Sequence, residues 1–200
     1  MLAELTRDAA LGDDHAALAA AREVGVGLCT IVGIDGSFSR RLGAQLAVLP
    51  DGSTIGSLAD GCLEAQLAVD IRALEYPKVI RYGRGSPKID FRLPCGGGLD
   101  ILLDPAPDRR ACRRALDKLV DRQPAKIGLP EISPLPERRY LPSLRIAAFG
   151  EGPELTGLGA LAAAMGIELV TYDKDRLTLG RTAEDCQLDP GTAALLLFHD

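Results

Sequence analysis

The chain has 200 residues and a formal net charge of −5, with 46% hydrophobic and 26% charged residues. A chain of this length buries about 70% of its surface on folding, and the composition excludes a disordered protein, so we expect a globular core without disulfides. The longest apolar block, at 193–198, is far shorter than the roughly 18 residues of a membrane span, which excludes a transmembrane protein. The acidic balance excludes a general attraction to nucleic acid or to anionic membranes.

The N-terminal segment and the cysteines both indicate a cytoplasmic protein. Residues 1–8 carry acids where a signal peptide has a basic flank and an apolar stretch. The cysteines are odd in number and widely spaced, so we expect reduced thiols. They are Cys29, Cys62, Cys95, Cys112 and Cys186. No Cys-x-x-Cys pair and only two histidines are present, so neither a zinc site nor a hydrolase triad is supported.

Residues 1–122 are predicted to form a mixed α/β domain with a mixed sheet. Asp51 and Gly52 supply the turn of a β-hairpin, because glycine accepts the positive backbone angle there. The helix after the hairpin has one apolar face from Leu63 to Leu74 and ends before Pro77. In chain order, the periodicities predict a helix at 13–23, strands at 26–33, 45–49 and 54–58, a helix from 60 or 61 onward, strands at 79–82, 89–93 and 99–103, and a helix at 108–122.

A proline-rich stretch is predicted to link this domain to a second one. Residues 123–143 hold five of the 13 prolines and show neither a helical nor an alternating pattern, as is typical of an interdomain linker. Residues 144–200 predict a Rossmann-like βαβ domain, with a strand at 144–149, a helix at 154–165 and strands at 167–172 and 193–198. This is half of a doubly wound sheet, and it leaves open whether the natural chain extends beyond Asp200.

Three glycine-rich blocks, at 36–43, 60–64 and 94–98, are the candidate functional segments of the first domain. Glycine beside Cys62 or Cys95 lets the backbone approach a ligand and leaves the thiol uncovered. Cys62 should open a helix, whose N-terminus favours a thiolate. Spacing alone leaves open that Cys62 is a small buried residue and Cys95 a turn residue. The other three cysteines are expected to be structural.

The local charge of this region favours an anionic ligand. Residues 36–98 hold eight Lys or Arg and six Asp or Glu, in a chain that is acidic overall. Arg40 and Arg41 follow two serines, Ser37 and Ser39, so guanidinium groups, hydroxyls and backbone amides are all available to a phosphate. A solvated turn is the alternative interpretation of the same residues.

Together the three blocks resemble the xanthine dehydrogenase accessory factor family, XdhC/CoxI. The segments that carry the resemblance are GSFSRRLGAQ at 36–45, GSLADGCLEA at 56–65 and CGGGLDILLDP at 95–105. The resemblance covers residues 15–105, and the second domain is similar to the Rossmann-like domain of that family. Asp60 departs from the family pattern, because it puts an acid beside the expected anion site where the family has a small residue.

The resemblance implies a cofactor-maturation accessory protein rather than a turnover enzyme. Such a protein binds the molybdenum cofactor (molybdopterin), assists the installation or protection of its terminal sulfur, and delivers it to a molybdenum hydroxylase of the xanthine dehydrogenase type. A homodimer and a cysteine desulfurase partner are also implied. Cys62 and Cys95 inherit the cofactor or sulfur-handling role, with molybdenum contact through either thiol left open. The implied cofactor-binding residues are Ser37, Ser39, Arg40, Arg41, Gly43, Gly61, Cys62, Glu64, Cys95, Gly96 and Gly97.

A second candidate site lies at the strand-to-helix turn of the second domain. Gly150 and Gly152 match the start of a dinucleotide fingerprint, and Asp173 fits its ribose-binding acid. Leu155 stands at the third glycine position, and acids at 151 and 154 put like charge where a pyrophosphate binds. An NAD(P)-dependent oxidoreductase is therefore the rival hypothesis, and a degenerate interaction module is the third.

Overall fold

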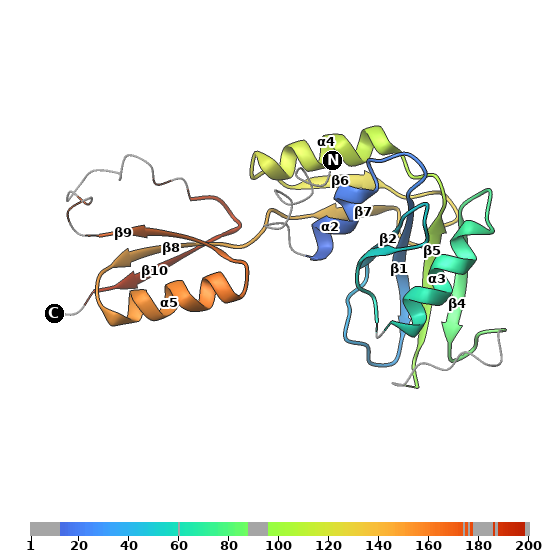
Figure 1. Cartoon of the computed structure of the whole chain (residues 1–200), viewed down its shortest axis with the longest axis horizontal. Helices are drawn as coiled ribbons and strands as arrows, with labels where there is room; N and C mark the ends of the chain where they lie inside the picture. The colour runs from blue at the N-terminus through green and yellow to red at the C-terminus, as the bar shows by residue number, and fades with distance from the viewer. Residues whose placement is uncertain are drawn as a thin grey trace. The chain divides into compact units, whose positions relative to one another are not determined.

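The computed structural model describes residues 13–59, 61–87, 96–173, 175, 177, 186 and 188–198. The chain divides into two compact units (Figure 1). The N-terminal unit holds residues 13–118 and 124–140, and the C-terminal unit holds residues 119–123 and the described residues from 141 onward. Strands and helices occur in both units, which confirms the α/β class. None of the described helices combines the length and the apolar character that crossing a membrane requires.

A five-stranded sheet forms the centre of the N-terminal unit, in the order β3-β2-β1-β5-β4. Its strands are β1 (Gly27–Asp35), β2 (Gln45–Val48), β3 (Thr54–Gly56), β4 (Lys78–Gly83) and β5 (Gly98–Asp104). Every neighbouring pair of strands is antiparallel, so the prediction of a mixed sheet is wrong. The reason is that β1 lies between β2 and β5, which both run opposite to it, and the parallel strands β1, β3 and β4 are never neighbours.

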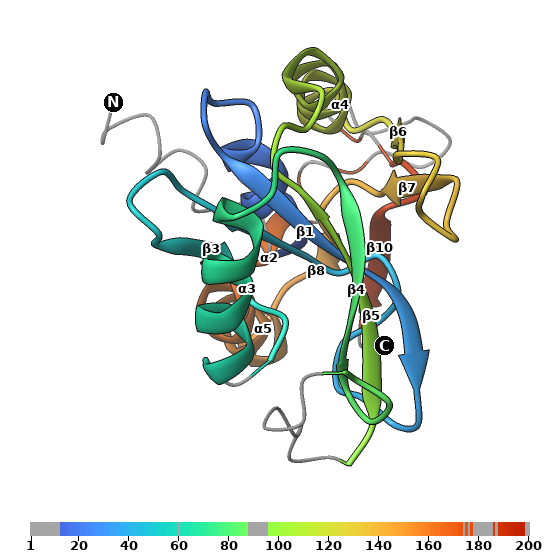
Figure 2. The same ribbon diagram turned by 90° about the vertical axis from the view of Figure 1, so that its right-hand side faces the viewer.

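Helices α2 (Asp13–Ala20), α3 (Cys62–Arg72) and α4 (Arg109–Val120) belong to the same part of the fold. Figure 2 shows α3 along one side of the sheet. Its predicted apolar face is confirmed, because Leu63, Leu67 and Ile71 are each at most 2% exposed. These side chains join one core cluster with Cys29 of β1 and Leu46 of β2. Burial of such an apolar stripe is what holds a short helix on a sheet.

The segment expected to be a linker contains a β-hairpin, formed by β6 (Ala125–Gly128) and β7 (Glu137–Tyr140). Tyr140 is 1% exposed, and its hydroxyl donates to Gln45 Oε1 at 2.7 Å. The amide nitrogen of Gln45 in turn donates to Thr30 Oγ1 at 3.0 Å. This buried chain of hydrogen bonds ties the hairpin to β1 and β2. The sequence pattern hid the hairpin because each strand has only four residues and three prolines occupy the turn between them.

The C-terminal unit contains the predicted βαβ arrangement. Its elements are β8 (Arg145–Gly150), α5 (Pro153–Ala164), β9 (Glu168–Tyr172) and β10 (Thr192–Leu197). The three strands are parallel, in the order β10-β8-β9, so the third strand pairs with the first. The rings of Phe149 and Tyr172 stack with their centroids 4.9 Å apart. Arg122 joins this unit through its ion pair with Asp189, in which Nε lies 2.5 Å from Oδ2.

The other predicted elements agree with the structure to within three residues at each end. The predicted strand at 89–93 lies outside the described residues, as do Asp60 and Cys95, and the side chain of Cys62 is not described either.

Candidate functional site

Antiparallel pairing brings the three glycine blocks to one end of the five-stranded sheet, hereafter the glycine end (residues 36–43, 57–64 and 96–98). β1, β3 and β4 finish at this end, and β2 and β5 start there, because the register pairs Asp35 with Gly98 and Leu46 with Gly56. The loops that carry the blocks therefore leave the sheet next to one another (Figure 1). Residues separated by about 60 positions in the sequence thus share one edge of the fold.

Direct contacts join the first block to the third. Gly36 has a φ of 90°, and a Cβ built on it would lie 3.6 Å from the Cα of Gly97. The amide of Arg84 donates to the carbonyl of Gly97 at 2.8 Å. The guanidinium of Arg84 donates to both carboxylate oxygens of Asp35, at 2.6 and 3.1 Å. The positive φ of Gly36 is a backbone conformation that residues with a side chain rarely adopt, which explains why glycine suits the position.

A charge cluster that the sequence analysis missed stabilises this junction. Arg81 donates to Asp35 and to Asp100, each at 2.9 Å, and Arg84 shares the same Asp35. The hydrogen bond from Arg84 is the main cause of the lowered pKa of the Asp35 carboxyl. The feature that could have revealed this cluster is the strand register, because Arg81 stands directly opposite Asp100 on the paired strands β4 and β5. The cluster fixes the ends of β1, β4 and β5 together.

Glu64 holds the second block in place. Its Oε1 accepts the amides of Leu58 and Ala59 at 3.0 and 2.6 Å, and its Oε2 accepts the amide of Gly61 at 2.8 Å. Burial raises the pKa of Glu64, but hydrogen bonds from backbone amides outweigh it and leave the pKa below its usual value. The carboxylate is therefore engaged with the loop 58–61 and positions the start of α3, rather than facing a ligand.

The backbone is bare at both glycines that neighbour the candidate cysteines. Cys62 is the first residue of α3, as predicted, and it follows Gly61, whose φ is 81°. A Cβ built on Gly61 would meet no described atom within 4 Å, and the same holds at Gly96, whose φ is 67°. Open space among the described residues beside both glycines, and the helix N-terminus that follows Gly61, suit the close approach of an anionic group.

Two arginines form a basic pair where the first block ends. The guanidinium of Arg138, from β7, lies 4.8 Å from the ring centroid of Tyr140. A Cβ built on Gly43, whose φ is 81°, would lie 2.8 Å from Arg138 Cδ, so the arginine covers this glycine. Burial lowers the pKa of Arg138, and the nearby charge of Arg41 lowers it further. Sequence reasoning missed Arg138 because it lies in the stretch expected to be a linker.

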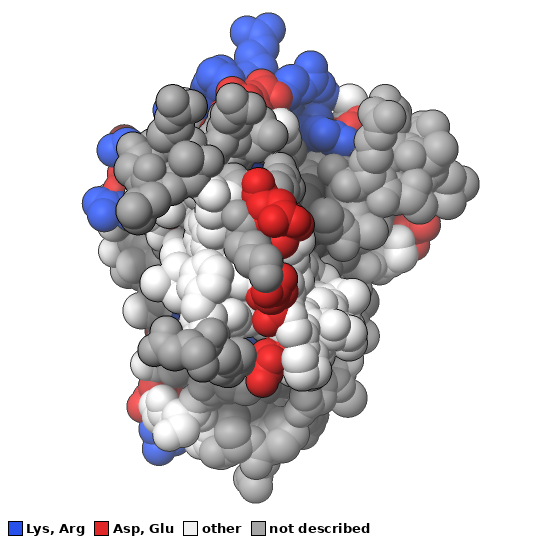
Figure 3. Space-filling model, turned by 90° about the vertical axis from the view of Figure 1, so that its left-hand side faces the viewer, with Lys and Arg blue, Asp and Glu red and all other residues white. Residues whose placement is uncertain are grey.

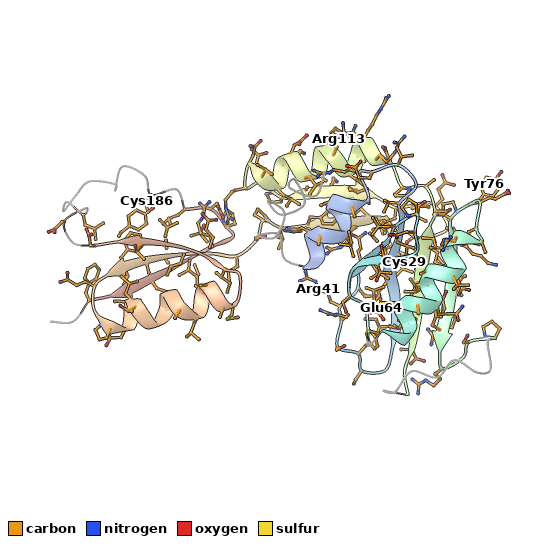
Figure 4. All side chains as sticks on the ribbon, viewed as in Figure 1. Cys29, Arg41, Glu64, Tyr76, Arg113 and Cys186 are labelled. Atoms are coloured by element: carbon orange, nitrogen blue, oxygen red, sulfur yellow. The ribbon has the colours of Figure 1, made fainter. Side chains whose placement is uncertain are left out.

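The remaining residues predicted for the first block lie in the turn between β1 and β2. Ser37, Ser39 and Arg41 are exposed there, and Arg40 is half-buried. Phe38 packs into the core cluster that also contains Leu58 and Leu63 of the second block. Figure 4 labels Arg41 and Glu64 on the N-terminal unit, with Cys29 inside its sheet. The exposed hydroxyls and the guanidinium of Arg41 are thus carried by an anchored turn.

Cys29 and Cys112 are buried, as predicted for structural cysteines. Burial raises the pKa of the Cys29 thiol far above its usual range, with a further contribution from Asp70. Burial also raises the pKa of Cys112 to about 11. Neither thiol is therefore a nucleophile near neutral pH. Cys186 is partly exposed and belongs to the C-terminal unit.

The second candidate site is acidic. Gly150 closes β8 with a φ of 140°, and the backbone of Leu197 occupies the space a Cβ would need. Gly152 precedes α5, whose first turn carries the exposed Glu154. Figure 3 shows a band of Asp and Glu on the side of the molecule where β8, β9 and β10 end in Figure 1. The acids that follow β8 and β9 in the sequence are Glu151, Glu154, Asp173 and Asp175. Such charge opposes a pyrophosphate at this turn.

Comparison with known proteins agrees with the glycine blocks. The model of the XdhC and CoxI family matches residues 19–83, which include the first and second glycine blocks and all elements from β1 to β4. Residues 19–83 of the chain are therefore similar to the XdhC and CoxI family. The resemblance recognised in the sequence is thereby confirmed.

Two relatives extend the comparison beyond the matched family segment. The molybdenum cofactor insertion chaperone PaoD of Escherichia coli (strain K12) is 34% identical over 199 aligned residues, covering 88% of this chain and 60% of PaoD. A crystal structure named as a xanthine dehydrogenase from Bacillus halodurans superposes with a TM-score of 0.61 at 22% identity, covering 77% of this chain and 60% of that one. The chain therefore spans about 60% of the length of each. At this identity the solved structure supports the fold alone.

Proposed function

We propose that this XdhC and CoxI family protein is an accessory protein that binds the molybdenum cofactor as its cargo and assists the cofactor's insertion into a molybdenum hydroxylase. The observation that carries the proposal is the convergence of all three glycine blocks at one end of the antiparallel sheet. The similarity to a molybdenum cofactor insertion chaperone supports the same cargo.

The residues at the glycine end fit an anionic, sulfur-bearing cargo. The pterin of this cofactor carries a phosphate, for which the exposed Ser37, Ser39 and Arg41 supply hydroxyls and a guanidinium. Arg138 adds a second positive charge beside Arg41. Bare backbone at Gly61 and Gly96 lets the cofactor approach without steric conflict.

In this proposal Cys62 and Cys95 contact the molybdenum centre or its terminal sulfur. A thiolate is a soft ligand, which suits a molybdenum dithiolene centre. Cys62 begins α3, where partial positive charge from the backbone amides favours the thiolate form. Glu64 supports this arrangement indirectly, because it fixes the loop that leads into the helix.

The proposal includes three further features that the family resemblance implies: the protein acts as a homodimer, receives sulfur with the help of a cysteine desulfurase, and delivers the cofactor to a hydroxylase of the xanthine dehydrogenase type. A cytoplasmic location, which the N-terminal sequence and the cysteines indicate, is part of the same proposal. A pull-down with purified desulfurase and client enzyme tests the two partners separately.

The deciding experiment measures cofactor retention under anaerobic conditions. The purified full chain is incubated with cofactor released from a molybdenum hydroxylase, free ligand is removed, and molybdenum and pterin are measured per chain. We expect about one of each per chain in the wild type and loss of both in the double variant Cys62→Ser/Cys95→Ser. The matched control is Cys29→Ser/Cys112→Ser, provided that it remains folded, and its retention should equal that of the wild type. Equal retention by all three proteins would overturn the site assignment.

A further inference from the structure

A cleft lined by arginines lies at the opposite end of the sheet from the glycine end. It is lined by the segment 22–26 that follows α2, the segment 105–107 that follows β5, and the first turns of α4. The cavity has a volume of about 870 Å³. Hereafter this is the arginine cleft, and its basic residues are Arg22, Arg109, Arg110, Arg113 and Arg114.

The sequence of α4 explains why four of these arginines share one face. The helix begins after Asp108, whose Oδ1 accepts the amides of Arg110 and Ala111 at 2.9 and 3.0 Å. Its apolar side is buried, with Cys112 at 1% and Leu116 at 6% exposure. The arginines occupy two pairs spaced by four residues, 109 with 113 and 110 with 114, on the exposed side. Figure 4 labels Arg113 on this helix.

The acids of the cleft offset only part of the charge of these arginines, because the lining holds five arginines and three acids. Glu23 pairs with Arg22, with Oε1 and Nε 3.4 Å apart. Asp108 accepts backbone amides, and its lowered pKa is caused mainly by the hydrogen bond from Ala111, with smaller contributions from the charges of Arg114 and Arg110. Within the described part of the chain, none of the four α4 arginines takes part in an ion pair shorter than 4.0 Å. Asp117 is the remaining acid of the lining. The cleft therefore carries an excess of guanidinium groups that face solvent.

We propose that the arginine cleft binds a small molecule that carries a diphosphate group. Each pair of arginines spaced by four residues can hold one phosphoryl group, because a guanidinium fork matches phosphate oxygens in a bidentate manner. A cavity of 870 Å³ lies in the range of small-molecule sites, roughly 300–1,000 Å³, and its concave walls favour a compact polyanion over the flat surface of a protein.

This site is separate from the glycine end. β1 connects the two ends and has nine residues, which at about 3.3 Å per residue corresponds to roughly 30 Å. One cofactor molecule at the glycine end does not reach the cleft. The inference therefore goes beyond the proposed function and does not depend on it.

Titration calorimetry of the full chain with inorganic pyrophosphate, in buffer with salt at physiological strength, tests the proposal. We expect saturable binding of one pyrophosphate per chain, and about tenfold or greater weakening in Arg109→Gln/Arg113→Gln. The matched control, Lys118→Gln/Arg139→Gln, removes the same charge from exposed positions outside the cleft and should change the affinity by less than about twofold. Thermal unfolding of both variants checks that they are folded.

Competition with adenosine diphosphate then identifies the source of the diphosphate. Displacement of pyrophosphate by adenosine diphosphate assigns the site to a nucleotide, and the absence of displacement assigns it to a diphosphate without a base; both results require the site. Lack of saturable binding at millimolar pyrophosphate would overturn the proposal, as would equal weakening in the control variant or tighter binding of citrate than of pyrophosphate. Loss of cofactor retention with intact pyrophosphate binding would reject only the proposed function.

Discussion

Both units place a glycine with positive φ in front of a helix, yet the two turns differ in what their acids do. Before α3, Glu64 is only 8% exposed, and its carboxylate accepts three backbone amides of the preceding loop. Before α5, Glu151 and Glu154 are exposed at the turn. Among the described residues, the acid of the first turn is therefore turned toward its own loop, whereas the acids of the second turn are exposed to solvent. Exposed carboxylates at a glycine-rich turn oppose the binding of an anion at the helix N-terminus.

Removing the inward-facing carboxylate should have the largest effect on stability. Glu64→Ala leaves three amides of the loop without their acceptor, so we expect the free energy of unfolding to fall by roughly 2–4 kcal/mol. Urea denaturation measures this change. The matched variant at the other turn, Glu154→Ala, should have little effect, because that side chain is exposed. Similar losses of unfolding free energy in the two variants would contradict the difference between the two turns.

Buried hydrogen bonds beneath the first block should also contribute to the stability of the N-terminal unit. Tyr140→Phe removes the donor to the buried Gln45 Oε1, so we expect a loss of about 1–2 kcal/mol in the free energy of unfolding. Tyr76→Phe is the control, since that tyrosine is 76% exposed and should be neutral. If Tyr140→Phe were neutral in urea denaturation, the hairpin of β6 and β7 would not be an integral part of the N-terminal unit.

The contribution of Glu64 should depend on pH in a defined direction. Its pKa is below the value of about 4.3 for an unfolded glutamate, so its stabilisation is fully present above that value and is lost as the pH falls through the folded pKa. The difference in unfolding free energy between the wild type and Glu64→Gln should be constant between about pH 7 and 5.5, and it should narrow below about pH 4. A difference that widens on acidification would contradict the lowered pKa. Glu154→Gln serves as the control.

Thiol reactivity separates the buried cysteines from those beside glycine. Cys29 and Cys112 are buried with raised pKa values, so we expect no alkylation of either by iodoacetamide at pH 8 in the folded protein. Cys62 and Cys95 should be alkylated under the same conditions, according to the proposed site. Peptide mass spectrometry distinguishes these thiols, and labelling of Cys29 at the rate of Cys62 would contradict the buried position.

Much of the fold follows from local patterns that the sequence displays. The apolar spacing from Leu63 to Leu74 predicts α3, and Asp51-Gly52 predicts the hairpin of β2 and β3, because each depends on neighbouring residues only. The antiparallel direction of the sheet depends on the long-range pairing of β1 with β5. The hairpin of β6 and β7 is local, but its four-residue strands and the prolines in its turn hide the alternating pattern.

The sequence indicates the segments of the candidate site but not the orientation of its side chains. Glu64 was predicted to bind the cofactor, and in the structure its carboxylate accepts hydrogen bonds from its own loop. Arg138 was missed because its contact with Gly43 joins residues 95 positions apart. Tertiary packing, rather than local sequence, sets the direction of a carboxylate and the contacts between residues that are so far apart in the chain.

Hydrogen exchange with and without bound cofactor tests whether the cofactor binds at the glycine end. The full chain is incubated anaerobically with cofactor released from a molybdenum hydroxylase, and amide exchange is followed by mass spectrometry. We expect protection in peptides that cover residues 36–43, 57–64 and 96–98, with no change at the turn from β8 to α5. Protection at residues 150–156 without protection of the three glycine blocks would contradict it.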